Sequence, residues 1–203
     1  ENRSWKQFPH FAHGCRTNHS REEAIIVAMI ASEKLKHAGY SHVNVFHDMT
    51  NAFLCTPHNT LNANARTNCT ARDAKLLKQR HEEASIVLEC PDRKICFQLG
   101  EGGMVGDHGG PISFMNAFHP GIKEWDEKVA SDNEHLLATI DPITKIDVDI
   151  GVTTYVDDIH AKHVINCIHK KTQEPVMSLQ KANNALDNIL DKAVNAQNRP
   201  KQE

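Results

Sequence analysis

Apolar residues recur at three- and four-residue spacing after Ser20 and again near the C-terminus, which is the pattern of helices with one buried face. Ser20 and Glu23 have the spacing of a capping box, and Gly39 suits the position just after a helix. Three further helices are predicted over residues 70–84, 111–130 and 177–198. The predicted buried stripes are Ala24, Ile25, Ala28, Ala31 and Leu35 on the first helix, and Leu179, Ala182, Leu186, Ile189, Leu190 and Val194 on the last.

Strands are predicted where β-branched and aromatic residues gather. Residues 42–47 (HVNVFH) form one such segment. Residues 85–90 and 94–99 flank the turn sequence Pro91-Asp92-Arg93, which predicts a hairpin. Residues 145–156 and 159–168 are predicted to form a second hairpin.

Two segments lack a regular pattern. Residues 48–68 contain Pro57 and several asparagines and are predicted to be turn-rich. Residues 100–110 hold six glycines, which is too many for a helix or strand. The order of helices and hairpins predicts an α+β fold.

Composition narrows the class of protein. A hydrophobic content of 39% in 203 residues suits a folded domain, and no apolar run approaches the roughly 20 residues of a membrane span. The net charge of −3 does not by itself favour a nucleic-acid binder. The six cysteines include no Cys-x-x-Cys pair, so free thiols are expected. His160 and His163 lie close together, but zinc needs more ligands, so the histidines are expected to be solvated or to pack.

Asp157 and Asp158 lie side by side at the tip of the predicted second hairpin. Two adjacent carboxylates repel each other unless a positive charge relieves them, and Mg²⁺ prefers such oxygen ligands. Asp48 follows the strand 42–47, so it joins the pair if that strand lies beside the hairpin. From these residues alone, a solvated turn and a metal site both remain open.

Four blocks together resemble the palm of a reverse transcriptase, most similar to those of non-LTR retrotransposons and group II introns. They are HGCRTNHSREEAI (13–25), VFHDMTNAF (45–53), GDHGGPISFMNAF (106–118) and TTYVDDI (153–159). The last block matches the family's YxDD motif in full. Cys15, His19, Leu54, His108 and Phe114 depart from the family pattern in the other three.

The resemblance implies a palm-like antiparallel sheet covered by helices on one face, with partial fingers. Residues 1–40 would be partial fingers and a linker helix, residues 41–175 the palm, and residues 176–203 the last palm helix before the thumb. The missing fingers and thumb segments would belong to a parent polyprotein. The resemblance also implies an intracellular protein, in the nucleus or the cytoplasm, with no membrane partner.

The resemblance further implies RNA-directed DNA polymerase activity on an RNA template, a DNA primer and dNTPs. The catalytic residues would be Asp48, Asp157 and Asp158. These carboxylates and the Met49 carbonyl would hold two Mg²⁺ ions, with Mn²⁺ as a possible substitute. The substrate-contacting residues would be Phe53, Gly109, Pro111, Ser113 and Tyr155. Two alternatives remain open: a degenerate, non-catalytic remnant that binds nucleic acid, and a different metal-dependent phosphotransferase or nuclease.

Overall fold

The computed structural model describes residues 9–16, 18–49, 52–103, 109–129, 137–165 and 173–193. Its helices are α1 (Arg21–His37), α2 (His58–Asn68), α3 (Ala71–Glu83), α4 (Gly110–Val129) and α6 (Gln173–Ala193). Its strands are β1 (Ser41–His47), β2 (Ser85–Cys90), β3 (Arg93–Gln98), β4 (Ala138–Ile140), β5 (Asp147–Asp149), β6 (Val152–Tyr155) and β7 (Asp158–Ile165). The α+β prediction is confirmed. None of the described helices combines the length and the apolar character that crossing a membrane requires.

The central sheet is antiparallel and has the strand order β1-β7-β6. Its register pairs His47 with Ile159, and Tyr155 with Asp158. The segment just before α1 extends this sheet beyond β6, because the His13 backbone N–H donates to the Thr154 carbonyl and the Thr154 N–H donates to the Phe11 carbonyl, both at 2.9 Å. The sheet therefore joins residues from both ends of the chain.

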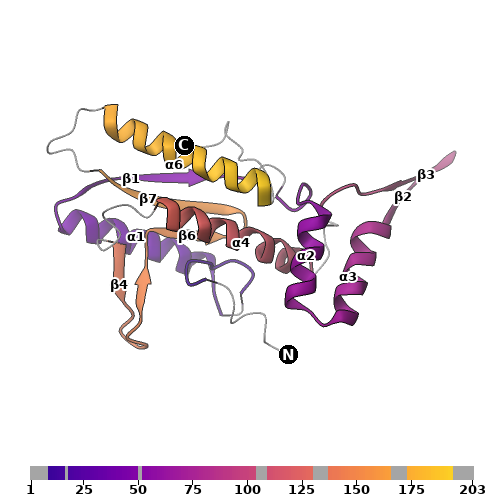
Figure 1. The fold of residues 1–203 in the computed structure, drawn as a ribbon, viewed down its shortest axis with the longest axis horizontal. Helices are drawn as coiled ribbons and strands as arrows, with labels where there is room; N and C mark the ends of the chain where they lie inside the picture. The colour runs from indigo at the N-terminus through magenta and orange to yellow at the C-terminus, as the bar shows by residue number, and fades with distance from the viewer. Residues whose placement is uncertain are drawn as a thin grey trace.

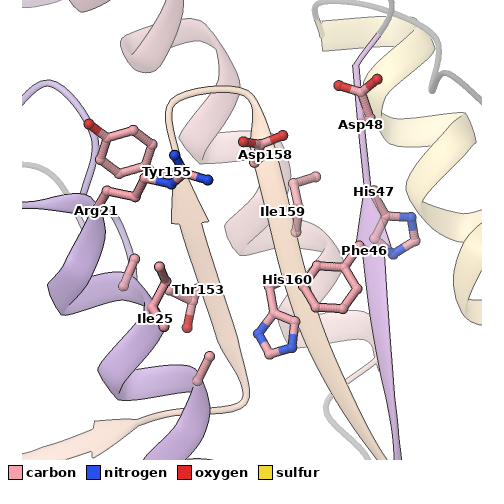
Figure 2. Close-up of a pocket in the computed structure, with 12 residues that line it drawn as sticks. Arg21, Ile25, Phe46, His47, Asp48, Thr153, Tyr155, Asp158, Ile159 and His160 are labelled. Atoms are coloured by element: carbon pink, nitrogen blue, oxygen red, sulfur yellow. The ribbon is translucent and has the colours of Figure 1, made fainter. Parts of the chain in front are cut away.

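Helices α4 and α6 pack side by side and cover one face of the central sheet, as Figure 1 shows. Residues two apart on a strand share a face, so Ile159 and Ala161 both enter the core beneath these helices. The largest buried side chains there are Trp125, Phe114 and Phe118 of α4. Helix α1 lies beside β6 and borders the opposite face of the sheet, as Figure 2 shows.

Several local signals placed helix ends correctly. The Ser20 side chain accepts a hydrogen bond from the Glu23 N–H at the start of α1, as predicted. The helix predicted from residue 70 begins at Ala71, because Thr70 is its cap and accepts from the Asp73 N–H. Gly39 has a φ of 77°, the left-handed conformation predicted for it. The β2–β3 hairpin also forms as predicted.

The prediction of a turn-rich segment over residues 48–68 is wrong for its second half, which is α2. Leu61 and Ala65 are one helical turn apart and both are buried. Asn62 is buried as well, but its amide donates to Glu82 and its oxygen faces the His81 ring, both on α3. Contacts with α3 therefore override the weak helix propensity of asparagine.

The prediction of one strand over residues 145–156 is also wrong. The segment divides at Gly151, whose N–H binds the Asp149 carboxylate at 2.7 Å. Before this point β5 pairs with β4, a strand that the sequence did not indicate, and after it β6 joins the central sheet. Residues 166–168 of the second predicted strand, and 194–198 of the last helix, lie outside the described residues.

One predicted core residue of α1 is on the surface. Ile25 is 49% exposed, whereas Ala24, Ala31 and Leu35 are buried as predicted. The reason is that the sheet meets α1 along a narrow stripe, while Ile25 borders an open pocket described below.

Acidification is expected to destabilise the chain through His119, which is 3% exposed on α4. Burial, helped by the Arg16 charge, lowers the pKa of His119 to about 3. Below pH ~6.5 the unfolded chain binds this proton and the folded chain does not, so stability falls by about 1.4 kcal/mol per pH unit from this residue. The loss continues until the folded imidazole also protonates.

Urea melts between pH 7 and pH 4.5 measure this dependence. His119→Gln is expected to reduce the slope of the unfolding free energy against pH by the equivalent of about one proton. The exposed control His37→Gln should leave this slope unchanged. An unchanged slope in His119→Gln would show that His119 does not contribute.

Candidate active site

Asp48 directly follows β1, and Asp158 is the first residue of the neighbouring strand β7. The β1–β7 register pairs His47 with Ile159, which brings Asp48, the residue after His47, beside Asp158. Both side chains line the same pocket, on the sheet face opposite α4 and α6 (Figure 2). The predicted proximity of the strand 42–47 to the second hairpin is thereby confirmed.

Asp157 lies in the tight turn that joins β6 to β7. Tyr155 and Asp158 pair across the turn, which leaves Val156 and Asp157 as a two-residue loop. Val156 has a φ of 61°, the positive value that a type II′ hairpin turn needs at this position. This φ is costly for a β-branched residue, so the surrounding contacts must hold the turn in place.

The three aspartates share one electrostatic environment. Partial burial raises the pKa of Asp157, and the Asp48 charge adds to the effect. Partial burial also raises the pKa of Asp158, together with the charges of Asp157 and Asp48, while Arg21 opposes the shift. The carboxylates therefore destabilise one another when ionised, and a divalent cation would relieve this repulsion. An all-oxygen cluster of this kind fits Mg²⁺.

The aspartates are close without forming a preassembled ligand cage. Among the described residues, one trio of His, Cys, Asp or Glu side chains has its ligand atoms all within 4.8 Å, and it is His13, His19 and Glu23. A cation at the aspartates must therefore draw the carboxylates together or reach some of them through water. Mg²⁺ commonly keeps several water ligands, so this spacing is compatible with it.

The pocket beside the aspartates has a volume of about 400 Å³. Helix α1 forms one wall through Arg21 and Ile25, and the sheet forms the other through Phe46 and Tyr155. Figure 2 shows Arg21 near Tyr155 at the same end as Asp158. The pocket combines a carboxylate pair, a guanidinium and an apolar wall, a mixture typical of ligand sites.

Gly14 packs directly against the turn that carries Asp157. A Cβ at Gly14 would lie 2.3 Å from the Val156 backbone nitrogen, a distance that no side chain tolerates. The neighbouring Cys15 is also close to this turn. Burial is the larger cause that raises the pKa of its thiol, and the Asp157 charge is the smaller one. The segment before α1 is therefore packed directly against the loop that carries Asp157.

Gly14→Ala is expected to displace the Val156–Asp157 turn and to cost on the order of 1–3 kcal/mol of stability. The matched control is Gly100→Ala, because a Cβ at Gly100 meets nothing within 4 Å. Chemical denaturation compares the two variants. Equal stability of both would contradict the packing described for Gly14.

The remaining predicted site residues divide into two groups. Tyr155 lines the pocket, and Met49 adjoins Asp48 with a buried side chain. Phe53 is partly buried against Phe114, with ring centroids 5.0 Å apart. Gly109, Pro111 and Ser113, in the turn before α4 and in its first turn, are half-buried. None of these three lines the pocket, and their predicted substrate contacts stay predictions.

The first part of the glycine-rich segment docks onto the chain that follows Asp48. Gly103 donates to the Phe53 carbonyl at 3.0 Å and Gly102 donates to the Thr56 carbonyl at 2.8 Å. Gly102 has a φ of 74°, and a Cβ there would lie 2.3 Å from the Leu54 carbonyl oxygen. Residues 104–108, which include the altered motif position His108, lie outside the described residues.

The sequence analysis did not predict the roles of two groups of residues near the site. Arg21 follows the helix cap and looked like an ordinary first-turn residue, but it faces the acidic end of the pocket. His13, His19 and Glu23 converge on the other side of the segment before α1. The signal for the second group was the spacing of His19 and Glu23, which places them one helical turn apart.

Fold and site together define an α+β domain with an acidic cluster at one end of an antiparallel sheet. Solved structures with this fold include apo telomerase from Candida tropicalis truncated from its C-terminal domain, with a TM-score of 0.61 and 12% identity over 95% of this chain and 35% of that one. Telomerase from Candida tropicalis in complex with a TWJ fragment of telomeric RNA has a TM-score of 0.65 and 9% identity, over 95% of this chain and 30% of that one.

Telomerase from Candida albicans, also in complex with a TWJ fragment of telomeric RNA, has a TM-score of 0.62 and 8% identity over 98% of this chain and 32% of that one. The chain thus spans about a third of the length of these telomerase structures. At these identities the likeness is one of fold. No protein-family model and no curated protein matches the chain.

Proposed function

We propose that this chain is the palm part of an RNA-directed DNA polymerase, a reverse transcriptase of a retroelement. The observation that carries the proposal is the convergence of Asp48 with Asp157 and Asp158 at one end of the sheet. Elements far apart in sequence bring these carboxylates together, in a fold shared with telomerase, itself an RNA-directed DNA polymerase.

The three aspartates would hold two Mg²⁺ ions, with the Met49 carbonyl as a further ligand and Mn²⁺ as a substitute. When bound, such ions neutralise the charge of the reacting phosphates and orient them. The protein's own part is to present Asp48 and Asp158 at one end of the pocket, with Asp157 in the adjoining turn. Arg21, at the pocket wall, would attract the phosphates of an incoming nucleotide.

The proposed reaction transfers a nucleotide to a primer. The primer 3′-oxygen forms a bond to the α-phosphorus of a dNTP, the bond from that phosphorus to the pyrophosphate oxygen breaks, and the hydroxyl proton leaves to solvent. Phe53 would pack against the sugar and disfavour a ribose 2′-hydroxyl. Its ring is fixed by Phe114, which supports a steric role.

The proposed partners are an RNA template, a DNA primer and dNTPs. Two of the aligned Candida telomerases were solved in complex with a TWJ fragment of telomeric RNA, which supports RNA as a partner of the natural protein. Because the chain spans about a third of those proteins, the segments that grip the duplex would lie in other parts of the natural protein.

A degenerate remnant that binds nucleic acid without catalysis is the second candidate. The observation that favours it is Leu54, which occupies a position that is usually acidic in the resembled family and is 43% exposed. The aspartates also lack the tight spacing of a preassembled site. The two candidates differ in one property, which is template-directed extension.

Primer extension on an RNA template in Mg²⁺, with the natural protein that contains this chain, separates them. We expect extension by the wild type, loss of extension in Asp158→Asn, and wild-type extension in Asp92→Asn. Asp92 is the matched control because it is exposed at the tip of the β2–β3 hairpin, away from the pocket. Binding of a primer–template without extension by the wild type would favour the remnant.

A further inference from the structure

His13, His19 and Glu23 form a second cluster, which the polymerase proposal does not use. Their ligand atoms all lie within 4.8 Å of one another. Glu23 Oε2 lies 3.4 Å from His13 Nδ1 and 2.8 Å from His19 Nδ1. One carboxylate oxygen of α1 thus faces two imidazole nitrogens of the segment that precedes this helix.

Backbone hydrogen bonds of the surrounding structure hold the cluster in place. The His13 side chain is 6% exposed, and its backbone N–H is held by the Thr154 carbonyl of β6. Glu23 lies in the first turn of α1, where the Ser20 cap holds its N–H, and the His19 N–H donates to the Arg16 carbonyl at 3.3 Å. The Nδ1 atoms of both histidines are buried, and each faces the Glu23 carboxylate. Two buried nitrogens aimed at one carboxylate are therefore available as ligands.

The distances match those around a small ion. Ligands bonded at 2.0–2.1 Å in a tetrahedral site lie about 3.3 Å apart. The His13–Glu23 contact of 3.4 Å already has this separation, and the His19–Glu23 contact has to open by roughly half an ångström. Two imidazoles and one carboxylate are typical ligands of Zn²⁺ and a poor set for Mg²⁺, which prefers oxygen.

We propose that His13, His19 and Glu23 form a zinc site with an open fourth position, separate from the aspartate cluster. The ion would tie the segment before α1 to α1 itself. That segment pairs with β6 and packs Gly14 against the turn that carries Asp157. The expected role is to brace this turn, not to take part in nucleotide transfer.

Zn²⁺ titration of the chain in competition with a chromophoric chelator tests the proposal. We expect one equivalent to bind to the wild type, with affinity lowered at least tenfold in Glu23→Gln and in His19→Gln. The matched control is Glu33→Gln/His37→Gln. These residues are also spaced i, i+4 on α1, but they are exposed, 3.9 Å apart and outside the His13, His19 and Glu23 trio. Circular dichroism confirms that each apo variant is folded.

Co²⁺ substitution excludes binding at the free cysteines, since thiolate ligands add an intense charge-transfer band that nitrogen and oxygen ligands lack. We expect no such band at one equivalent, and a visible spectrum that Glu23→Gln abolishes. Failure of the wild type to bind Zn²⁺ would overturn the proposal, as would binding equal in Glu23→Gln and the control. Asp158→Asn should leave Zn²⁺ binding intact, which separates this test from that of the polymerase site.

Discussion

Asp157→Asn is expected to make the chain more stable in metal-free buffer while lowering nucleotide transfer at least about a thousandfold, because charge stabilisation by a bound metal contributes several kcal/mol. The pKa of Asp157 is raised by burial and by Asp48, so its ionised form opposes folding at neutral pH. Asparagine keeps the size of the side chain and removes the charge. The proposed metal-binding role of Asp157 and the stability of the chain therefore place opposite demands on this position.

The pH dependence gives this prediction a definite sign. The raised pKa means that the folded chain takes up the Asp157 proton at a higher pH than the unfolded chain. The advantage of Asp157→Asn over the wild type is fully present at neutral pH and shrinks as the wild-type carboxyl protonates on acidification. Melting temperatures from pH 7 to pH 4 measure it.

Asp92→Asn is again the control, and its melting temperature should follow that of the wild type at every pH. A variant Asp157→Asn that is less stable than the wild type at pH 7 would show that the turn needs this charge for folding. Such a result would remove the electrostatic argument for a cation at the aspartates.

Trp125→Ala is expected to have the largest effect on stability, about 3–5 kcal/mol, as large-to-small changes of buried aromatic residues do. Trp125 is 1% exposed on α4, and its indole N–H donates to the Ala182 carbonyl of α6 at 2.9 Å. Its ring meets His47 of β1 edge-on, with centroids 5.9 Å apart. One side chain thus joins both helices to the strand that leads into Asp48.

Two further variants divide this effect into its parts. Trp125→Phe keeps much of the packing and loses the hydrogen bond, so we expect a smaller loss, on the order of 1–2 kcal/mol. Ile143→Ala removes a large apolar side chain that is 88% exposed and should be neutral. Urea midpoints with unchanged m-values measure all three. If Trp125→Ala were as mild as Ile143→Ala, the core assignment would be wrong.

The sequence was informative wherever the signal was local. Ser20 and Gly39 act through their own backbone and nearest neighbours, and the structure confirms their positions at the two ends of α1. The acidic turn and the strand before Asp48 could be joined because a strand and a hairpin that pair must bring their ends together.

The sequence did not predict those helices, strands and side-chain clusters that depend on contacts between distant residues. Asparagines favoured a turn over residues 48–68, but Asn62 finds two partners on α3, and α2 forms. Gly151 separates two strands that pair with different neighbours, a division that alternation alone does not reveal. His13 faces Glu23 while β6 holds its backbone through Thr154, so the sequence spacing of His13, His19 and Glu23 alone does not reveal the cluster.

The central claim is that Asp48 and the Asp157–Asp158 pair form one cation site. Electron paramagnetic resonance of Mn²⁺ titrated into the chain tests it most directly, with Zn²⁺ present to fill the His13–His19–Glu23 site. We predict Mn²⁺ binding by the wild type and by Asp92→Asn, displacement of that Mn²⁺ by Mg²⁺, and loss of binding in Asp48→Asn and in Asp157→Asn alike. Wild-type Mn²⁺ binding in either aspartate variant, or none in the wild type, would contradict the account.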